Sequence, residues 1–300
     1  MVWIQNYFSE GERLFPGKKN VLTLSLSAII LRSHLLIEDL PGMGKTTLIH
    51  YLAKAFDLDF KRIQGTSDLL PADITGINIF HPGEQTFQFK PGPIFSELLL
   101  MDELNRAPAK TQGALLQAME EKTVVVDGNN YQLPEHFCVM ATQNPSNQRG
   151  TYTLPESQLD RFLYRFPMGY PDKKAEIDIL KHETRRSLIQ KMSSLSSIKE
   201  LDLAFLEVQK IHVSDKVADY IWRLLDDSRK DVALLPLSPR CGIDIVKSSK
   251  CLAYLNHRDH VLPDDVQEIF PYVSNHRLAP DSFDKGFEAA HLILSRVSIL

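Results

Sequence analysis

A glycine-rich segment between an apolar run and an amphipathic stretch constrains the fold of this chain more than any other feature. It reads LIEDLPGMGKTT over residues 36–47 and follows an apolar run at residues 34–37. The residues after it have helical periodicity, with Leu48, Leu52 and Phe56 on one face. A strand, a glycine loop and a helix N-terminus in this order present unpaired N–H groups and a positive dipole end to a phosphate. The segment therefore predicts a phosphate-binding loop.

Within such a loop the residue types predict their own roles. Lys45 reaches the β and γ phosphates of a nucleotide, and the Thr46 hydroxyl holds Mg²⁺. The usual pattern is G-x-x-x-x-G-K-[ST], and Asp39 stands where its first glycine belongs. The predicted nucleotide-binding residues of the loop are Pro41, Gly42, Met43, Gly44, Lys45, Thr46 and Thr47.

The composition is that of an ordinary globular protein. With 300 residues, 43% hydrophobic and 24% charged, the chain has material for about two domains. A net charge of -4 argues against a protein that binds nucleic acid by neutralising many phosphates. Three widely spaced cysteines fit a reducing compartment. The N-terminus lacks a signal-peptide pattern, and the apolar stretch at residues 21–31 is too short to cross a bilayer. We therefore expect a cytoplasmic protein without a membrane span.

Apolar runs of strand character alternate with helical patterns in the first half of the chain. Such alternation predicts an α/β fold with a mostly parallel sheet covered on both faces. The predicted strands lie at residues 34–38, 60–64, 98–102, 137–142 and 162–166. After residue 172 the pattern is helical, with helices predicted at residues 173–190, 204–208, 215–227, 240–256 and 264–273. We expect a core domain at residues 1–171 and an α-helical domain at residues 172–300.

Two segments interrupt the alternation of strand and helix. Residues 76–93 are rich in Gly, Pro and Phe and predict an inserted hairpin. Residues 123–133 contain two β-prone runs around Asp127 and Gly128, which predicts a second hairpin. Each hairpin is either a surface decoration or a moving part.

Polar residues at the ends of two predicted strands complete the candidate site. Asp102 and Glu103 end the third apolar run, as the acids of a P-loop ATPase do, where one holds Mg²⁺ and the other polarises the attacking water. A lone acidic pair would only solvate a strand end, but its combination with Lys45 and Thr46 favours catalysis. Asn144 ends the fourth run, where its amide can bind the γ-phosphate and position water, or where Asn-Pro merely makes a turn.

Taken together, these segments resemble the motifs of the MoxR family of AAA+ ATPases, from about residue 20 to residue 277. The matching segments are EDLPGMGKT at 38–46, DLLPADITG at 68–76, GPIF at 92–95, MDELNRAP at 101–108, ATQNP at 141–145, GTYTLP at 150–155 and QLDRF at 158–162. The resemblance implies an αβα P-loop sandwich whose parallel five-stranded sheet has the order 5-1-4-3-2. It also implies a C-terminal helical lid, an insert in the second helix at about 76–93, and a hairpin before sensor 1 at about 123–133.

The resemblance also implies a role for each matching residue. Arg161 resembles an arginine finger, a cation from a neighbouring subunit that stabilises the transferred phosphate and is worth about 10³–10⁵ in rate. Arg240, in Ser-Pro-Arg, resembles sensor 2. A plain salt-bridging role for Arg161 and a structural role for Arg240 remain open. The other matches are Lys45 and Thr46 to Walker A, Asp102 and Glu103 to Walker B, and Asn144 to sensor 1.

The expected function is Mg²⁺-dependent ATP hydrolysis by a ring, most simply a hexamer, that remodels a client protein. The family resemblance alone implies a von Willebrand factor A domain protein as partner. A nucleic-acid motor is one alternative, but the hairpin at 123–133 has only Lys122 and Asp127 as nearby charges and no basic surface. A scaffold gated by nucleotide with little hydrolysis is the other alternative, and intact Glu103 and Arg161 argue against it.

Overall fold

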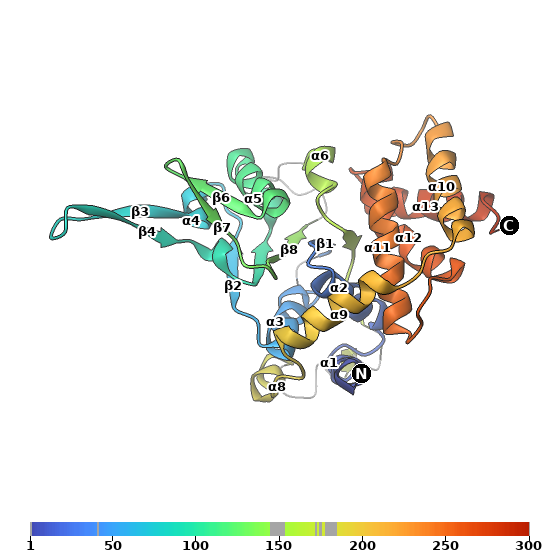
Figure 1. Ribbon diagram of the computed structural model, residues 1–300, viewed down its shortest axis with the longest axis horizontal. Coiled ribbons are helices and arrows are strands. Elements are labelled where there is room, and N and C mark those ends of the chain that lie inside the picture. The colour runs from blue at the N-terminus through green and yellow to red at the C-terminus, as the bar shows by residue number, and fades with distance from the viewer. Residues whose placement is uncertain are drawn as a thin grey trace.

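The computed structural model describes residues 2–40, 42–144, 154–171, 173, 176–177 and 185–299. Its core is a five-stranded sheet in which every neighbouring pair of strands is parallel (Figure 1). The strands are β1 Leu35–Glu38, β2 Phe60–Gln64, β5 Leu98–Asp102, β8 Cys138–Gln143 and β9 Tyr164–Phe166. The predicted parallel five-stranded sheet is confirmed.

The order of strands across this sheet is β2-β5-β8-β1-β9. Its numbers differ from the expected 5-1-4-3-2 because the numbering along the chain counts β3, β4, β6 and β7, which belong to the two hairpins. Among the core strands alone, β9 is the fifth, β1 the first, β8 the fourth, β5 the third and β2 the second. The phosphate-binding loop thus follows a strand that has neighbours on both sides.

Alternation of side chains along the strands gives the sheet two apolar faces. Leu35 and Ile37 pack in a cluster with α1 (Val2–Leu14), α2 (Lys19–Ile30) and α3 (Lys45–Phe56). Leu36 packs in a second cluster with α5 (Ala109–Glu121). The result is a three-layered α/β sandwich. The sequence analysis predicted neither α1 nor α2.

Both predicted hairpins are present and lie side by side (Figure 1). The first pairs β3 (Gly76–His81) with β4 (Thr86–Pro91), and the second pairs β6 (Thr123–Val126) with β7 (Asn129–Gln132). The Phe89 and Tyr131 rings stack with centroids 3.9 Å apart, and the Asn78 amide donates to Asp127 at 2.7 Å. These contacts tie one hairpin to the other. The short elements nearby are α4 Pro71–Thr75, η1 Pro93–Phe95 and η2 Leu104–Arg106.

The rest of the described chain is helical, as predicted for the region after residue 172. A short helix, α6 (Glu156–Leu159), precedes β9. The later helices are α8 Arg185–Lys191, α9 Ile198–Lys210, α10 Asp215–Lys230, α11 Pro239–Leu255, α12 Pro263–Leu278 and α13 Phe283–Arg296. Much of the helix predicted at residues 173–190 lies outside the described residues.

Two lid predictions need correction. The expected start of a helix at residue 204 is wrong, because Ser197 and Glu200 form a capping box that begins α9 at Ile198. The helix α13 was not predicted, although Ser282 caps it by accepting from the Lys285 N–H at 3.3 Å.

The lid and the core share one apolar interior. Buried residues of the lid, such as Tyr220, Ile245 and Val273, belong to the same cluster as Leu35 and Ile37. Helix α12 packs directly against β9. Within the described part of the chain, we find no helix with the length and apolar character that crossing a bilayer requires.

Candidate nucleotide-binding site

The loop between β1 and α3 has the backbone conformation of a phosphate cradle. Gly42 and Gly44 have φ of +86° and +92°, a region that favours glycine. A Cβ at either position would meet nothing within 4 Å, so backbone conformation rather than space requires glycine there. Gly44 is the N-cap of α3 and no side chain caps this end, so the first N–H groups of the helix remain available to an anion. Pro41 lies outside the described residues.

The Lys45 ammonium is buried at this loop. Its side chain is 7% exposed, and Nζ donates to the carbonyl oxygens of Asp39 and Leu40, the latter at 3.3 Å. Burial lowers the pKa of Lys45, and the nearby carboxylates of Asp39, Asp102 and Glu103 act in the opposite direction. Lys45 is therefore held beside the loop by carbonyl groups, which a phosphate can replace.

The acidic pair ends β5, which lies two strands away from β1 in the sheet. Asp102 accepts from the Thr142 hydroxyl at 2.6 Å and forms an ion pair with Arg62 at 2.7 Å. Glu103 follows with φ of +53°, which ends the strand and turns its side chain away from the line of β5. The carboxylate of Asp102 is fixed by its partners.

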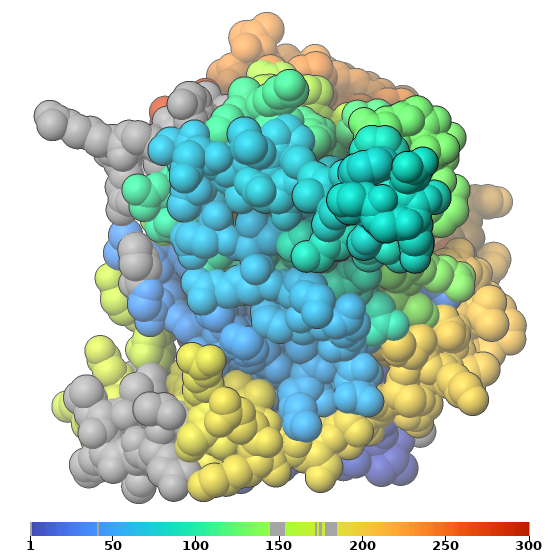
Figure 2. Space-filling model, turned by 90° about the vertical axis from the view of Figure 1, so that its left-hand side faces the viewer, coloured from blue at the N-terminus to red at the C-terminus, as the bar shows by residue number. Residues whose placement is uncertain are grey.

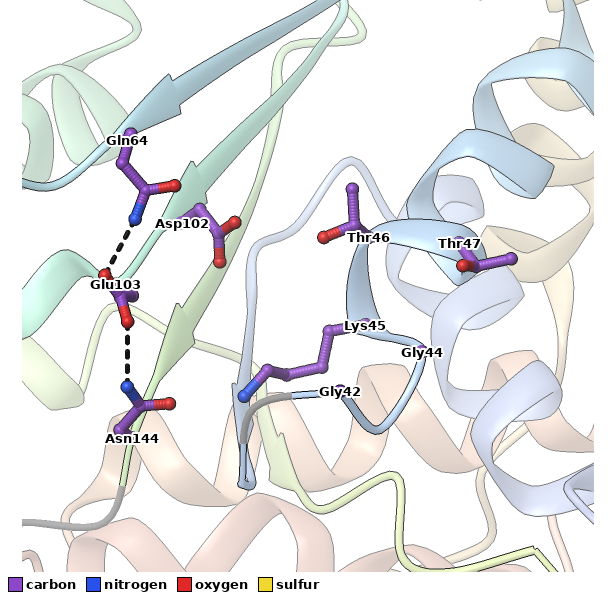
Figure 3. A pocket seen from close by; sticks show the side chains of 9 residues that line it. All are labelled: Gly42, Gly44, Lys45, Thr46, Thr47, Gln64, Asp102, Glu103 and Asn144. Carbon is purple, nitrogen blue, oxygen red and sulfur yellow. Dashed lines mark hydrogen bonds between the residues drawn. The ribbon is translucent and has the colours of Figure 1, made fainter. Parts of the chain in front are cut away.

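The Glu103 carboxylate is oriented by amides on the two strands that flank β5. Asn144, directly after β8, donates from Nδ2 to Oε1 at 2.9 Å, and Gln64, at the end of β2, donates from Nε2 to Oε2 at 2.8 Å. Arg106 adds a contact of 3.2 Å. Figure 3 shows the two amides on either side of Glu103. Asn144 is thereby placed to act together with Glu103.

These groups surround a single pocket of about 360 Å³ (Figure 3). It is lined by Gly42, Gly44, Lys45, Thr46, Thr47, Gln64, Asp102, Glu103 and Asn144. Free loop N–H groups and an ammonium fit a polyphosphate, and the Thr46 hydroxyl with the Asp102 carboxylate offers the hard oxygen ligands that Mg²⁺ prefers. Met43, one of the predicted loop residues, instead packs against the first apolar cluster.

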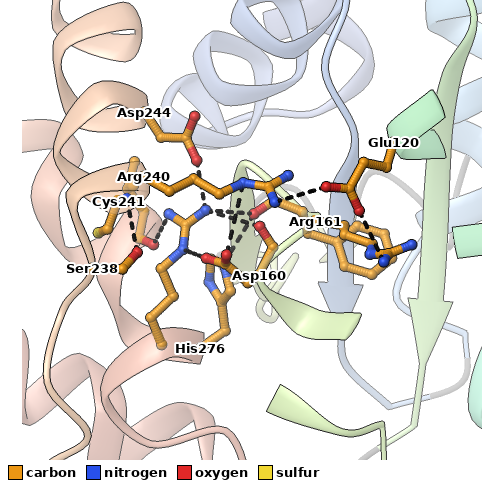
Figure 4. Close-up of polar contacts among 11 residues, drawn as sticks. Glu120, Asp160, Arg161, Ser238, Arg240, Cys241, Asp244 and His276 are labelled. Atoms are coloured by element: carbon orange, nitrogen blue, oxygen red, sulfur yellow. Dashed lines mark hydrogen bonds and ion pairs between the residues drawn. The ribbon is translucent and has the colours of Figure 1, made fainter. Parts of the chain in front are cut away.

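Arg161 and Arg240 do not line this pocket but meet at another carboxylate (Figure 4). Arg161 Nη2 lies 2.8 Å from Glu120 Oε2, and Arg240 Nη1 lies 3.3 Å from Glu120 Oε1. Glu120 is in the last turn of α5, whereas Arg161 follows α6 and Arg240 begins α11 of the lid. The structure therefore brings the two arginines together at Glu120, although Arg161 belongs to the core and Arg240 to the lid.

A further arginine, Arg277, shares the partner Asp160 with Arg240. Arg277, in α12, pairs with Asp160 and Asp244 at 2.6 Å each, and its side chain is 5% exposed. Arg240 also approaches Asp160, at 3.7 Å. We call Glu120, Asp160, Arg161, Arg240 and Arg277 the arginine cluster. Every arginine in it has a carboxylate partner.

Comparison with known proteins agrees with this architecture. The family model described as "ATPase family associated with various cellular activities (AAA)" matches residues 34–164, and the model "AAA lid domain" matches residues 230–296. The crystal structure of a protein from Cytophaga hutchinsonii superposes with a TM-score of 0.85 at 33% identity, covering 99% of this chain and 94% of that one.

Two relatives match over most of their length. "Uncharacterized protein YeaC" of Bacillus subtilis is 43% identical over 286 residues, which are 94% of this chain and 89% of that protein. "Chaperone MoxR1" of Mycobacterium tuberculosis is 36% identical over 283 residues, which are 90% of this chain and 74% of that protein. This chain belongs to the MoxR family of AAA+ ATPases. The family resemblance deduced from the sequence motifs is confirmed.

In this MoxR-family protein, the site includes residues that sequence reasoning missed. Gln64 lies opposite Asp102 in the register of β2 and β5. Because the carboxyl ends of parallel strands meet at one edge, the polar end of the second predicted strand was a usable signal. Glu120 and Asp160 had no such signal, since their significance comes from arginines distant in the sequence.

Proposed function

We propose that this protein is a Mg²⁺-dependent ATPase. The observation that carries the proposal is the pocket in which Lys45, Thr46, Asp102 and Glu103 meet. Lys45 and the N–H groups of the loop bind the β and γ phosphates, and Thr46 and Asp102 hold the metal ion. Mg²⁺ supplies neutralisation of the charge that develops on the phosphate oxygens.

In this proposal Glu103 is the base that takes a proton from the attacking water. Its carboxylate is turned toward the pocket by the amides of Gln64 and Asn144, at 2.8 and 2.9 Å. These two hydrogen bonds fix the orientation of the carboxylate, and a candidate base must first be placed within reach of the proton that it takes. Asn144, in this proposal, also donates to the γ-phosphate as sensor 1.

We further propose that Arg161 and Arg240 act on ATP bound to a neighbouring subunit of a ring, most simply a hexamer. Both lie outside the pocket of their own chain and share Glu120 as partner. An interface that draws Arg161 to a phosphate therefore also presents Arg240. In the assembled protein, residues 1–171 form the nucleotide-binding core and residues 172–300 the lid.

A client protein is the expected target of this activity, because an exposed hairpin offers apolar side chains for it. On β3 and β4, Phe80 is 48% exposed and Phe87 71% exposed, and their rings lie 5.1 Å apart. Figure 2 shows this hairpin end-on, in teal, standing in front of the core. An exposed pair of aromatic rings suits protein contacts better than phosphate contacts. As a MoxR-like chaperone of the cytoplasm, the protein would act on a partner with a von Willebrand factor A domain.

Calorimetry and ATP turnover test this proposal directly. Wild-type protein should bind ATP with Mg²⁺ and hydrolyse it, whereas Lys45→Ala should show no measurable heat of binding. Glu103→Gln should bind ATP but hydrolyse it about 10²–10⁴-fold more slowly, if the carboxylate is the base. The matched control is Lys54→Ala, in the last turn of the same helix. Unchanged ATP binding by Lys45→Ala would place the nucleotide elsewhere. A wild-type ring that assembles and binds ATP but does not hydrolyse it would favour the alternative of a scaffold gated by nucleotide.

A further inference from the structure

Glu38, the last residue of β1, and Asp39, the first residue of the loop, are bonded to β9 and to the segment that follows it. Glu38 ends β1, and its Oε2 accepts from Nε and Nη2 of Arg165 on β9, at 2.9 and 2.6 Å. Asp39, which replaces the usual glycine, accepts from the Gly169 N–H at 2.8 Å. Neither Glu38 nor Asp39 lines the nucleotide pocket. Both connect the entrance of the loop to residues 165–169.

Arg165 itself reaches from this loop into the lid. Its side chain is 1% exposed, and the donors that do not bind Glu38 face lid carbonyls: Nη1 lies 3.1 Å from Pro280 O and 3.5 Å from Ala279 O. Residues 279 and 280 form the turn between α12 and α13. The lid in turn binds the Arg165 backbone, because Asn275 Nδ2 donates to its carbonyl at 2.9 Å.

The ammonium of Lys45 is linked to the same path. Lys45 Nζ donates to the carbonyl of Asp39, the same residue whose carboxylate accepts from the Gly169 N–H. A phosphate that takes Lys45 as its partner removes this bond. The peptide that loses it directly follows Asp39, whose carboxylate is held by the Gly169 N–H, and Glu38, which Arg165 holds, is the residue before Asp39. A change of partner at Lys45 therefore bears directly on the contacts that reach the lid.

We propose that Arg165 is a positioning residue that couples nucleotide binding to the lid through Glu38 on one side and the carbonyls of residues 279 and 280 on the other. The proposal rests on ATP binding at the pocket described above. It also explains the departure at Asp39, whose carboxylate provides a second connection from the loop to residue 169. A planar guanidinium can serve both sides at once, whereas a lysine ammonium is a point charge on a flexible stem.

The test compares R165K with R258K in full-length protein, using hydrogen–deuterium exchange and ATP turnover. Arg258 forms an equivalent two-bond pair with Asp265, at 2.6 and 2.5 Å, within the lid and without contact to the loop. Wild-type protein should change exchange at residues 279–285 when the non-hydrolysed analogue ATPγS binds. R165K should bind ATPγS within about threefold of wild type, but lose this change and turn ATP over about tenfold more slowly, within the range typical of coupling between sites. R258K should keep both.

Each outcome decides the question. A normal exchange response in R165K, or loss of ATPγS binding as complete as in K45A, would overturn the coupling role. Equal losses in R165K and R258K would show a merely structural effect. If R165K does not fold, the E38L/R165M variant replaces both buried charges with apolar side chains, a change that buried pairs often tolerate. That variant should bind ATPγS without a lid response, and a retained response would refute the proposal. A wild-type protein that binds no ATPγS would instead refute the proposed function itself.

Discussion

The nucleotide pocket and the arginine cluster use the same kinds of charged residue in opposite ways. In the pocket, Lys45 is bound by backbone carbonyls, and the N-terminus of α3 has no side-chain cap. In the arginine cluster, Arg161, Arg240 and Arg277 each pair with a carboxylate. The pocket therefore leaves its charge available to a ligand. The arginines of the cluster are already paired with Glu120, Asp160 and Asp244.

This difference has a physical consequence for how each region can act. A ligand entering the pocket replaces carbonyl oxygens, which are weak partners for an ammonium compared with a phosphate. A phosphate that recruits Arg161 must compete with Glu120, which is 43% exposed and so contributes a modest, screened interaction. Arg277, with a 5% exposed side chain and two carboxylates, is bound far more firmly. Within the cluster, only the half-exposed pairs can be exchanged.

The largest effect that would test this comparison is expected from Arg161→Ala. If Arg161 acts in trans, the variant should bind ATP normally but hydrolyse it about 10³–10⁵-fold more slowly. Mixing it with Glu103→Gln protein should restore part of the activity, because hybrid interfaces combine an intact arginine with an intact base. The control is Arg13→Ala, a 60% exposed surface arginine of α1. Mixed rings without any recovery would contradict action in trans.

A smaller effect is expected from Arg240→Ala. Loss of one charged hydrogen bond to a phosphate corresponds to about 10- to 100-fold in turnover. The same mixing experiment with Glu103→Gln assigns the arginine to its own or to the neighbouring site. Turnover unchanged from wild type would leave Arg240 as a structural residue that binds Glu120.

Acid should destabilise the fold through a buried histidine beside the arginine cluster. His276, beside Arg277, donates to the Phe162 carbonyl at 3.0 Å, and burial, followed by the charges of Arg277 and Arg165, places its pKa well below 6.5. The folded protein keeps this imidazole neutral, while the unfolded chain binds a proton below about pH 6.5. The contribution of neutral His276 to the free energy of unfolding is complete above about pH 6.5. Below that pH it falls by about 1.4 kcal/mol per pH unit, until the pKa of His276 in the folded protein is reached.

Urea denaturation between pH 7 and pH 5 measures this slope. Burial also lowers the pKa of His34 in the core to about 4, so His34 adds the same slope between pH 6.5 and about 4. His276→Asn and His34→Asn should therefore each reduce the slope by up to about 1.4 kcal/mol per pH unit. The nine residues that line the pocket include no histidine. A pH dependence of stability unaltered by either variant would contradict the burial of neutral imidazoles.

The smallest effect is expected from Glu120→Gln. Removing a half-exposed carboxylate that competes for Arg161 and Arg240 is worth about 0.2–1 kcal/mol, or no more than about fivefold in turnover. We expect a modest increase in the ATPase rate, measured at a fixed, saturating concentration of ATP. Abolished activity would mean that Glu120 does more than hold the two arginines.

The features that were predicted correctly are those that depend on residues close together in the sequence. The glycine loop, the five core strands and both hairpins follow from local periodicity, turn residues and glycine conformation, and the structure contains each of them. The helices α1, α2 and α13 were missed. The start of α9 was placed too late because Ser197 and Glu200 were not recognised as a capping box.

What the sequence by itself determined was a parallel sheet with a phosphate-binding loop and two acids, because chain order places such loops and acids at the carboxyl ends of strands. Only the tertiary structure decided that Arg161 and Arg240 share Glu120, and that Arg165 joins Glu38 to residues 279 and 280. These contacts join residues more than 30 positions apart on core and lid. Their formation depends on how α11 packs against α2 and α12 against β9, which no local pattern specifies.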